Sequence, residues 1–235
     1  MSRLITSVNN DLVVAWSKLK QAKHQRKQGK YIIEEMHIID EARKANLNME
    51  IIVTEDSGLG GDYIVSDHVM RKISQNESLN EIVALVDISE TYKELGNKVI
   101  YLDNIQDPGN AGTIIRTAYA FGYDTVVLAN GVSKYNHKLI NATKGSIFHM
   151  NIIADLDLAA LKPEYKLIGT LIDEDALAIE DLEKTDKFVL VFGNEGVGIS
   201  DAIIELLDQS VYIPMNEFDS LNVGVTAGIV LYYLK

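Results

Sequence analysis

Cysteine is absent from the 235-residue sequence, and its absence excludes both disulfide bonds and thiolate metal sites. Because disulfides are typical of oxidising compartments, the sequence favours a cytoplasmic location. The five histidines, at positions 24, 37, 68, 137 and 149, lack metal-ligand spacing, and no metal is expected. No apolar run approaches the ~18 residues of a membrane span, and the first residues lack a signal peptide's apolar core, so no membrane partner is expected.

Two nucleotide-binding motifs are also missing. The glycines at 193, 196 and 198 are spaced G-x-x-G-x-G, which is not the G-x-G-x-x-G dinucleotide fingerprint, and a nicotinamide cofactor is not implied. No G-x-x-x-x-G-K-[ST] phosphate loop occurs anywhere in the chain, and the stretch Asp107–Asn110 is not one either. An ordinary doubly wound nucleotide-binding enzyme is therefore disfavoured.

Charge is distributed unevenly along the chain. The net charge of −12 by itself argues against a nucleic-acid partner. Residues 1–30 nevertheless carry a local charge of +6, which leaves −18 for the rest. The seven basic side chains there are Arg3, Lys18, Lys20, Lys23, Arg26, Lys27 and Lys30, against the single acid Asp11. This asymmetry is typical of a basic patch for a polyanion, although charge alone favours the simpler interpretation of a solvated helix face.

The N-terminal part reads as a compact α/β unit. Hydrophobic periodicity predicts helices over residues 8–29, 36–45 and 67–73, and strands over 30–34, 50–54, 63–65 and 82–86. Trp16 is expected to be a core residue. Periodicity is lost after this unit, so we predict a domain over residues 1–88, a linker over 89–97 and a second domain over 98–235.

The second domain also alternates strands with helices. Strands are predicted over 98–103, 125–129, 149–153, 166–171, 188–192 and 211–214, and helices over 113–121, 137–143, 157–161, 179–183, from about 200, and over 222–234. Since strands and helices alternate throughout, we predict for this domain a parallel sheet covered on both faces. The Gly-rich turn after Phe192 is a candidate ligand site, because open α/β sheets bind ligands at the carboxyl ends of their strands.

Three stretches in the second domain carry a family resemblance. They are Leu102–Gly122, Val191–Ser200, and Ile213–Met215 together with Ser220–Val223. In this order and separation they resemble the motifs of the SpoU (TrmH-type) branch of the SPOUT RNA methyltransferases, over about residues 98–235. The N-terminal part resembles, more loosely, the L30e/L7Ae-like RNA-binding domain that often precedes them.

The resemblance implies a fold and an activity that the residues alone do not. It implies a catalytic domain with a deep trefoil knot, a homodimer, S-adenosylmethionine bound in the knot, and methylation of ribose 2′-hydroxyls of ribosomal or transfer RNA. The L30e-like domain makes 23S rRNA the expected target. Two alternatives stay open, namely a tRNA 2′-O-methyltransferase and a non-catalytic module that binds cofactor and RNA.

Site residues follow from the motif positions. The resemblance implies catalytic roles for Asn110, Arg116, Glu195, Ser220 and Asn222. It implies cofactor contacts for Leu128, Ala129, Gly193, Asn194, Gly196, Ile213, Met215 and Leu221. Phosphate contacts are expected from Lys23, Arg26, Lys27, Arg116, Lys138 and Lys144.

Arg116 is interpreted as an anchor for RNA phosphate and a stabiliser of developing alkoxide, because a guanidinium does not readily act as a base. Asn110 and Glu195 are expected to fix Arg116 and the turn through hydrogen bonds. Outside the motif context, Asn110 would be interpreted as a turn residue and Glu195 as a charge at a helix N-terminus.

The chain departs from the family pattern at several positions. Glu34-Glu35 stands in place of a Glu-Gly pair, and Asn136-His137-Lys138 with Asn141 in place of a Pro-Lys pair followed by Arg. Gly224 and Thr226 replace a Ser and an Ala of the third motif. These changes bear on the target RNA more than on the catalytic class.

Overall fold

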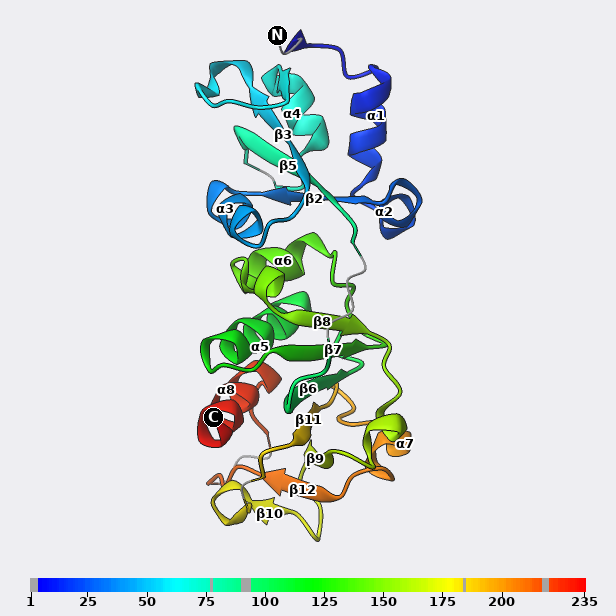
Figure 1. Cartoon of the computed structure of the whole chain (residues 1–235), viewed down its shortest axis with the longest axis vertical. Coiled ribbons are helices and arrows are strands. Elements are labelled where there is room, and N and C mark those ends of the chain that lie inside the picture. Colours follow the sequence, from blue (N-terminus) through cyan, green and yellow to red (C-terminus); the bar gives the residue numbers. More distant parts are fainter. Residues whose placement is uncertain (1–3, 77, 90–93, 184, 217–219) are drawn as a thin grey trace. The chain divides into compact units, whose positions relative to one another are not determined.

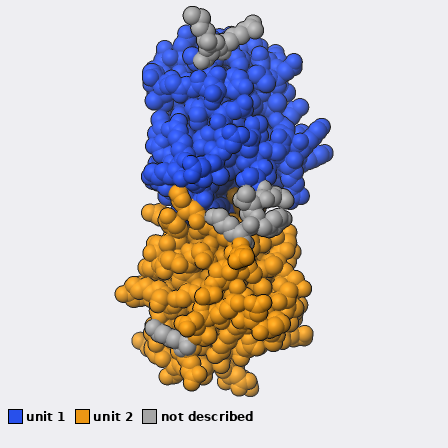
Figure 2. Space-filling model, in the orientation of Figure 1, with its two compact units in different colours: residues 1–91, 135–148 blue, residues 92–134, 149–235 orange. Residues whose placement is uncertain are grey.

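The computed structural model describes residues 4–76, 78–89, 94–183, 185–216 and 220–235. The chain divides into two compact units, the first comprising residues 1–91 and 135–148 and the second residues 92–134 and 149–235 (Figure 2). Helix α6 (His137–Thr143) thus belongs to the first unit, although it follows strands of the second in the sequence. The predicted linker over 89–97 lies partly outside the described residues. The division into functional domains over 1–88 and 98–235 remains a prediction.

The first unit is built on a five-stranded mixed sheet. Its strands, in spatial order, are β1 (Leu4–Ile5), β4 (Tyr63–Val65), β3 (Met49–Thr54), β5 (Ile82–Asp87) and β2 (Lys30–Glu34). Strand β5 runs antiparallel to both neighbours, so this sheet is mixed, unlike the parallel sheet predicted for the second domain. Alternation of helices and strands in the sequence indicates that a helix separates two strands. It does not predict whether the next strand runs parallel or antiparallel to its neighbours.

The helices of the first unit correct the prediction of one helix over residues 8–29. Two helices, α1 (Asp11–Lys18) and α2 (Ala22–Gln28), are separated by a turn at Leu19. The buried Gln25 side chain donates to the Leu19 carbonyl at 2.9 Å, so this turn is satisfied without continuing the helix. Helices α3 (Met36–Lys44) and α4 (Asp67–Ile73) match their predictions closely. Trp16 is buried as expected, within one of the two apolar clusters of the unit.

The second unit contains a seven-stranded sheet in which every described pairing is parallel, which confirms the prediction. The strands, in spatial order, are β10 (Leu177–Ala178), β12 (Gln209–Tyr212), β9 (Lys166–Thr170), β11 (Phe188–Phe192), β6 (Lys98–Asp103), β7 (Thr125–Ala129) and β8 (Asn151–Ala154). All residues of β7 and β11 are buried, as continuous apolar strands in a doubly covered sheet should be. Figure 1 shows α5 and α8 on one face of this sheet and α7 on the other.

Helix α5 (Pro108–Ala120) begins five residues before the predicted start at 113. Asp107 accepts the backbone N–H of Asn110 at 2.7 Å and Pro108 occupies the first turn, so the sequence Asp-Pro-Gly-Asn is a capped helix start rather than a free turn. Helices α7 (Asp201–Ile204) and α8 (Val223–Leu234) lie close to their predicted positions. The helices predicted over 157–161 and 179–183 are short 3₁₀ turns, Leu158–Leu161 and Ile179–Asp181. Among the described helices, none is both long and apolar enough to cross a bilayer.

Candidate active site

A pocket of about 630 Å³ opens at the carboxyl ends of β9, β11 and β12. Its wall consists of four segments that lie far apart in the sequence: residues 170–172, the loop 193–199, residues 211–215, and the start of α8 with the residues before it. The carboxyl ends of parallel strands meet at one edge of a sheet, so these segments converge there. The volume falls within the ~300–1,000 Å³ range of small-molecule sites.

The loop 193–199 is shaped by its own backbone. Asn194 and Gly198 exchange both backbone hydrogen bonds at 2.9 Å, which folds the loop back on itself. The Asn194 side chain also accepts the backbone N–H of Gly196 at 2.8 Å. A Cβ at Gly193 would lie 2.2 Å from the Gly198 carbonyl carbon, so only glycine fits there. The loop therefore presents backbone, rather than side-chain bulk, to the pocket.

Asn110 joins two other segments of the site. Its side-chain amide donates to Glu195 at 3.1 Å, and its carbonyl oxygen accepts from the Asn222 side chain at 2.9 Å. Asn222 also caps α8, because its Oδ1 accepts the backbone N–H of Gly224 at 2.9 Å. Residues separated by 85 and 112 positions are thereby connected at one edge of the pocket. A solitary turn residue and a solitary helix-end charge would not produce this arrangement.

The segments that meet at this pocket are also those that a family model describes. The model of the SpoU rRNA Methylase family matches residues 97–232. The chain belongs to the SpoU rRNA methylase family. A second model, described as the MRM3-like substrate binding domain, matches residues 10–84.

Individual relatives of this SpoU protein cover almost its whole length. The chain is 32% identical to the 23S rRNA (guanosine(2553)-2′-O)-methyltransferase RlmP of Bacillus subtilis, over 98% of both chains. It superimposes on a solved RNA 2′-O ribose methyltransferase with a TM-score of 0.81 and 27% identity, covering 99% of this chain and 98% of the other. The AdoMet-bound rRNA methyltransferase from Sinorhizobium meliloti shares the fold, with a TM-score of 0.86 at 23% identity over 99% and 97% of the two chains.

Most site residues expected from the motifs of the SpoU family line the pocket. The lining residues among them are Gly193, Asn194, Glu195, Gly196, Ile213, Met215, Ser220, Leu221 and Asn222. Leu128 and Ala129 do not line it, because they end strand β7, which β6 separates from β11. Thr170, Leu171 and Ile172 also line the pocket and were not expected. The order of strands in the sheet, which places β9 beside β11, is the only signal that could have indicated them, and a single sequence does not contain it.

Arg116 lies apart from the Asn110 contacts. It follows Asn110 by six residues on α5, a rotation of about 240°, so the two side chains leave the helix on different sides. Within the described parts of the chain, the Arg116 guanidinium is exposed and has no hydrogen-bond or ion-pair partner. The expected hydrogen bonds between Arg116 and both Asn110 and Glu195 are therefore not formed, because Asn110 bonds Glu195 and Asn222 instead.

The pocket of this SpoU protein fits S-adenosylmethionine in its chemistry as well as its size. Backbone segments at Gly193–Gly196 and Ile213 supply hydrogen-bonding groups, and Leu221 and Ile172 supply exposed apolar surface for a flat ring. Glu195 supplies a carboxylate at the pocket edge. Among the described residues there is no group of three or more histidine or acidic side chains that could hold a metal ion.

The candidate RNA contacts of the first unit differ in their availability. Lys23, Arg26 and Lys27 are exposed on α2 and form no ion pair with any described residue. Lys138 on α6 is likewise exposed and unpaired within the described chain, whereas Lys144 forms an ion pair with Glu35 at 3.3 Å. Four of the five cations expected to contact RNA in this unit are therefore free to meet phosphate.

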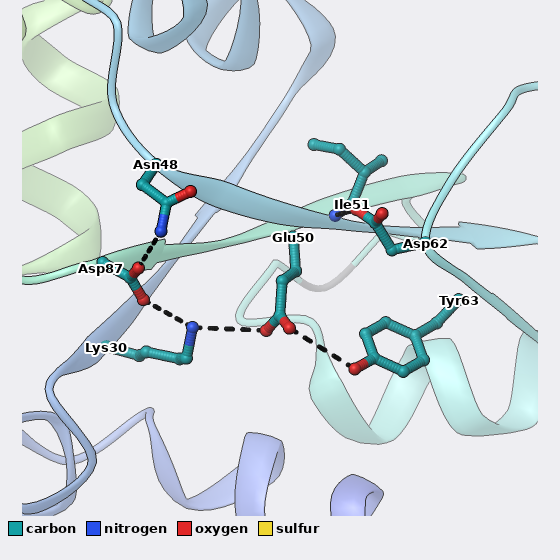
Figure 3. Close-up of polar contacts among 7 residues, drawn as sticks. All are labelled: Lys30, Asn48, Glu50, Ile51, Asp62, Tyr63 and Asp87. Atoms are coloured by element: carbon teal, nitrogen blue, oxygen red, sulfur yellow. Dashed lines mark hydrogen bonds and ion pairs between the residues drawn. The ribbon is translucent and has the colours of Figure 1, made fainter.

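Lys30, counted in the basic N-terminal region, is not free. Figure 3 shows its ammonium between Asp87 at 2.5 Å and Glu50 at 3.3 Å, with Glu50 also accepting from the Tyr63 hydroxyl. The hydrogen bond between Lys30 and Asp87 raises the pKa of Lys30 and lowers the pKa of Asp87. Asp87 is held further by the Asn48 side-chain amide. This cluster neutralises one cation of the N-terminal region and leaves the exposed cations of residues 18–27 as the basic surface of the described part of that region.

Proposed function

We propose that this protein transfers a methyl group from S-adenosylmethionine to a ribose 2′-hydroxyl of 23S rRNA. The observation that carries the proposal is the connection of all three family motifs through Asn110 at the edge of a cofactor-sized pocket. The relative RlmP, similar over the whole chain, is named for this reaction on 23S rRNA. The match of residues 10–84 to a substrate-binding domain supports RNA recognition by the first unit.

When bound, S-adenosylmethionine supplies an electrophilic methyl group on a positively charged sulfur. The residues around the pocket would hold it through the backbone of loop 193–199, Ile213 and Leu221. The hydrogen bonds of Asn110 fix the pocket rim before substrate arrives, so no reorganisation is required at the moment of reaction. In the overall step the 2′-oxygen forms a bond to the methyl carbon, the carbon–sulfur bond breaks, and the 2′-proton passes to solvent.

Arg116 is proposed to bind the RNA phosphate next to the reacting ribose. A guanidinium stays protonated in proteins, so it lowers the free energy of the developing 2′-alkoxide rather than removing the proton. The Arg116 guanidinium has no partner among the described residues, which supports this role, because an exposed guanidinium is then available for bidentate phosphate binding. Ser220 lines the pocket beside Asn222 and is proposed to contact either the cofactor or the ribose.

Three finer features belong to the same proposal: a deep trefoil knot around the cofactor, a cytoplasmic location, and a homodimer. The homodimer is supported by exposed apolar side chains on α5 and α8, where Tyr119, Val225, Ile229 and Tyr232 are 40–59% exposed. Analytical ultracentrifugation tests it: the wild type should sediment as a dimer and an Ile229→Glu variant as a monomer. A monomeric wild type would remove this part of the proposal.

A 2′-O-methylation map tests the reaction and its target together. Total RNA from a strain lacking this protein is compared with RNA from strains complemented by the wild type or by Arg116→Ala. We expect one 23S rRNA site to be lost and to be restored by the wild type only. A lost tRNA site would instead establish a tRNA methyltransferase. If no site is lost, the reaction proposal is wrong, and binding of radiolabelled S-adenosylmethionine would then identify a non-catalytic binding module.

A further inference from the structure

Three amide side chains form a strip at the carboxyl edge of the sheet of the second unit. Asn104 directly follows β6, Gln106 lies two residues on, and Asn130 directly follows β7. Asn104 and Asn130 both have left-handed backbones, with φ of 56° and 54°, a conformation that Asn tolerates better than most residues. We call Asn104, Gln106 and Asn130 the amide strip.

Hydrogen bonds fix the orientation of two amides in the strip, those of Gln106 and Asn104. Gln106 Nε2 donates to the backbone carbonyl of Asn130 at 3.0 Å and to Asn104 Oδ1 at 2.5 Å. A backbone carbonyl can only accept, so the atom of Gln106 that faces it must be the nitrogen. The atom of Asn104 that faces Gln106 must then be the oxygen. Gln106 Oε1 and Asn104 Nδ2 consequently have no partner among the described residues, and Gln106 is exposed.

The backbone beneath the strip is tightly held. The Asn104 N–H donates to the Ala129 carbonyl at 2.8 Å, and the Val132 N–H donates to the Ile105 carbonyl at 3.0 Å. A Cβ at Gly131 would lie 2.4 Å from the Ile105 carbonyl oxygen, so the two strand ends approach as closely as glycine allows. Gln106 Oε1 and Asn104 Nδ2, which have no partner in the described part of the chain, are therefore held in place before any ligand binds.

The strip is connected to the candidate active site by direct contacts. The Asn194 side chain, which lines the pocket, donates to the backbone carbonyl of Asn104 at 2.8 Å. On the other side, Gln106 precedes Asp107, the residue that caps α5 and binds the backbone N–H of Asn110. The amide strip thus borders the segment that carries the motif contacts, at the same edge of the sheet as the pocket.

We propose that Asn104 Nδ2 and Gln106 Oε1 read the hydrogen-bonding edge of the base whose ribose is methylated. Each nucleobase has a donor and an acceptor side by side on its edge, and a neighbouring amide acceptor and amide donor are the complement of that pair. Bases of single-stranded RNA are read in this way when they are splayed out of the stack. This inference rests on the proposed RNA substrate, and it makes Gln106 and Asn104 positioning residues for the nucleotide.

The test is a double-mutant cycle between Gln106 and the base. The variant is Gln106→Leu, which keeps the side-chain size but cannot hydrogen-bond. The RNA is a fragment carrying the nucleotide mapped in the deletion strain, with either the natural base or an abasic nucleotide at that position. The matched control is Gln209→Ala, since the Gln209 amide likewise donates two hydrogen bonds, both to backbone carbonyls, but lies at the amino end of β12. Both kcat/KM for methyl transfer and equilibrium RNA binding are measured.

We expect Gln106→Leu to lower kcat/KM on natural RNA by about 10-fold, the discrimination typical of one base contact. On abasic RNA the same substitution should have no further effect, and S-adenosylmethionine binding should be unchanged. Gln209→Ala should match the wild type throughout. If Gln106→Leu lowers the rate equally on natural and abasic RNA, the side chain acts only on the fold of the loop and the inference is wrong.

Failure of the proposed reaction gives a different result. If the wild type transfers no methyl group to any RNA, the proposed function is wrong. The cycle is then carried out on the RNA fragment that crosslinks to the wild type, with the abasic nucleotide at the crosslinked position. RNA binding is the only quantity measured in that case. Binding that depends on the base in the wild type but not in Gln106→Leu would still support base reading by the strip. If the abasic nucleotide weakens RNA binding by the same factor in the wild type and in Gln106→Leu, the inference is wrong.

Discussion

Glu35 has a backbone conformation that residues other than glycine rarely adopt. Replacing Glu35 should therefore reveal how much this conformation lowers the stability of the protein. Its φ is 71° and its ψ is 126°, immediately before α3. Its carboxylate meets the Lys144 ammonium at 3.3 Å, with the two side chains 39% and 45% exposed. Glycine, which the family resemblance leads us to expect at this position, is the one residue for which a positive φ carries no penalty. The structure therefore predicts that Glu35→Gly relieves strain at the expense of an exposed ion pair.

Three contributions decide the magnitude. A non-glycine residue in a sparsely populated region costs about 1–3 kcal/mol, and relief of this backbone strain is the largest of the three effects. Glycine increases the entropy of the unfolded chain, which lowers the free energy of unfolding by about 0.5–1 kcal/mol. The exposed ion pair is worth about 0–1 kcal/mol. We expect Glu35→Gly to raise the free energy of unfolding by about 0.5–1 kcal/mol, and Glu35→Ala, which keeps the strain and loses the ion pair, to lower it by about 0.5 kcal/mol.

Urea unfolding of the wild type and both variants measures these differences, monitored by the fluorescence of Trp16 because that side chain is buried in the first unit. The informative quantity is the difference between glycine and alanine, since both variants lack the carboxylate. A glycine variant no more stable than the alanine variant would refute the claim of backbone strain. The freed Lys144 ammonium should also strengthen RNA binding of both variants by a few fold, and an additional Lys144→Met change should abolish that gain.

Three further predictions follow from the charged residues. Arg116→Ala should lower kcat by at least ~10²-fold with unchanged S-adenosylmethionine affinity, and single-turnover assays with a loss below tenfold would contradict its role. Reversing the charges of Lys23, Arg26 and Lys27 should weaken RNA binding and flatten its salt dependence by roughly 0.7–0.9 per lost phosphate contact, whereas cofactor titration should not change. Because its lysine partner holds the pKa of Asp87 below the ordinary 3.8, the stabilisation is present above pH 3.8 and disappears as the pH falls through the lower folded value. The stability difference between the wild type and Asp87→Asn should therefore be about 0.5 kcal/mol at pH 7 and shrink as the pH is lowered below 3.8, and a difference independent of pH would contradict the ion pair.

Local patterns predicted the elements whose boundaries depend on their own residues. The strands Lys98–Asp103, Thr125–Ala129 and Phe188–Phe192 begin and end as predicted, because each is a continuous apolar run bounded by polar or turn residues. The helix predicted over 8–29 is divided because Gln25 bonds a carbonyl at the turn, a contact that periodicity does not encode. The start of α5 was predicted late because Asp-Pro-Gly-Asn suits both a turn and a capped helix start.

The candidate site was predicted where family motifs name its residues and missed where only the sheet order brings them together. Gly193, Glu195 and Asn222 carry the motifs and meet at the pocket. Thr170 reaches the pocket only because β9 lies between β11 and β12, an order that no local pattern specifies. The direct bond between Asn110 and Glu195 was not predicted either, since the motif names both residues without saying which of them touch.

Residues that depart from the family pattern are concentrated in the first unit, apart from Gly224 and Thr226 in α8. Asn136 caps α6 through the backbone N–H groups of Lys138 and Leu139. The ring of His137 lies 2.9 Å from the Asn76 side chain and 3.0 Å from that of Asn141. Ile140, on the same helix, is buried in an apolar cluster of the unit.

These contacts attach α6 to the unit that matches a substrate-binding domain. Burial lowers the pKa of His137, so its imidazole is neutral at pH 7 and adds no charge beside Lys138. The residues that keep the pattern, Asn110, Glu195 and Asn222, form the pocket contacts of the second unit. We therefore expect relatives to share the proposed methyl-transfer site, and we expect the surface formed by α2 and α6 to select the RNA. Exchanging residues 135–148 for those of a relative should therefore change which RNA is bound without changing cofactor affinity.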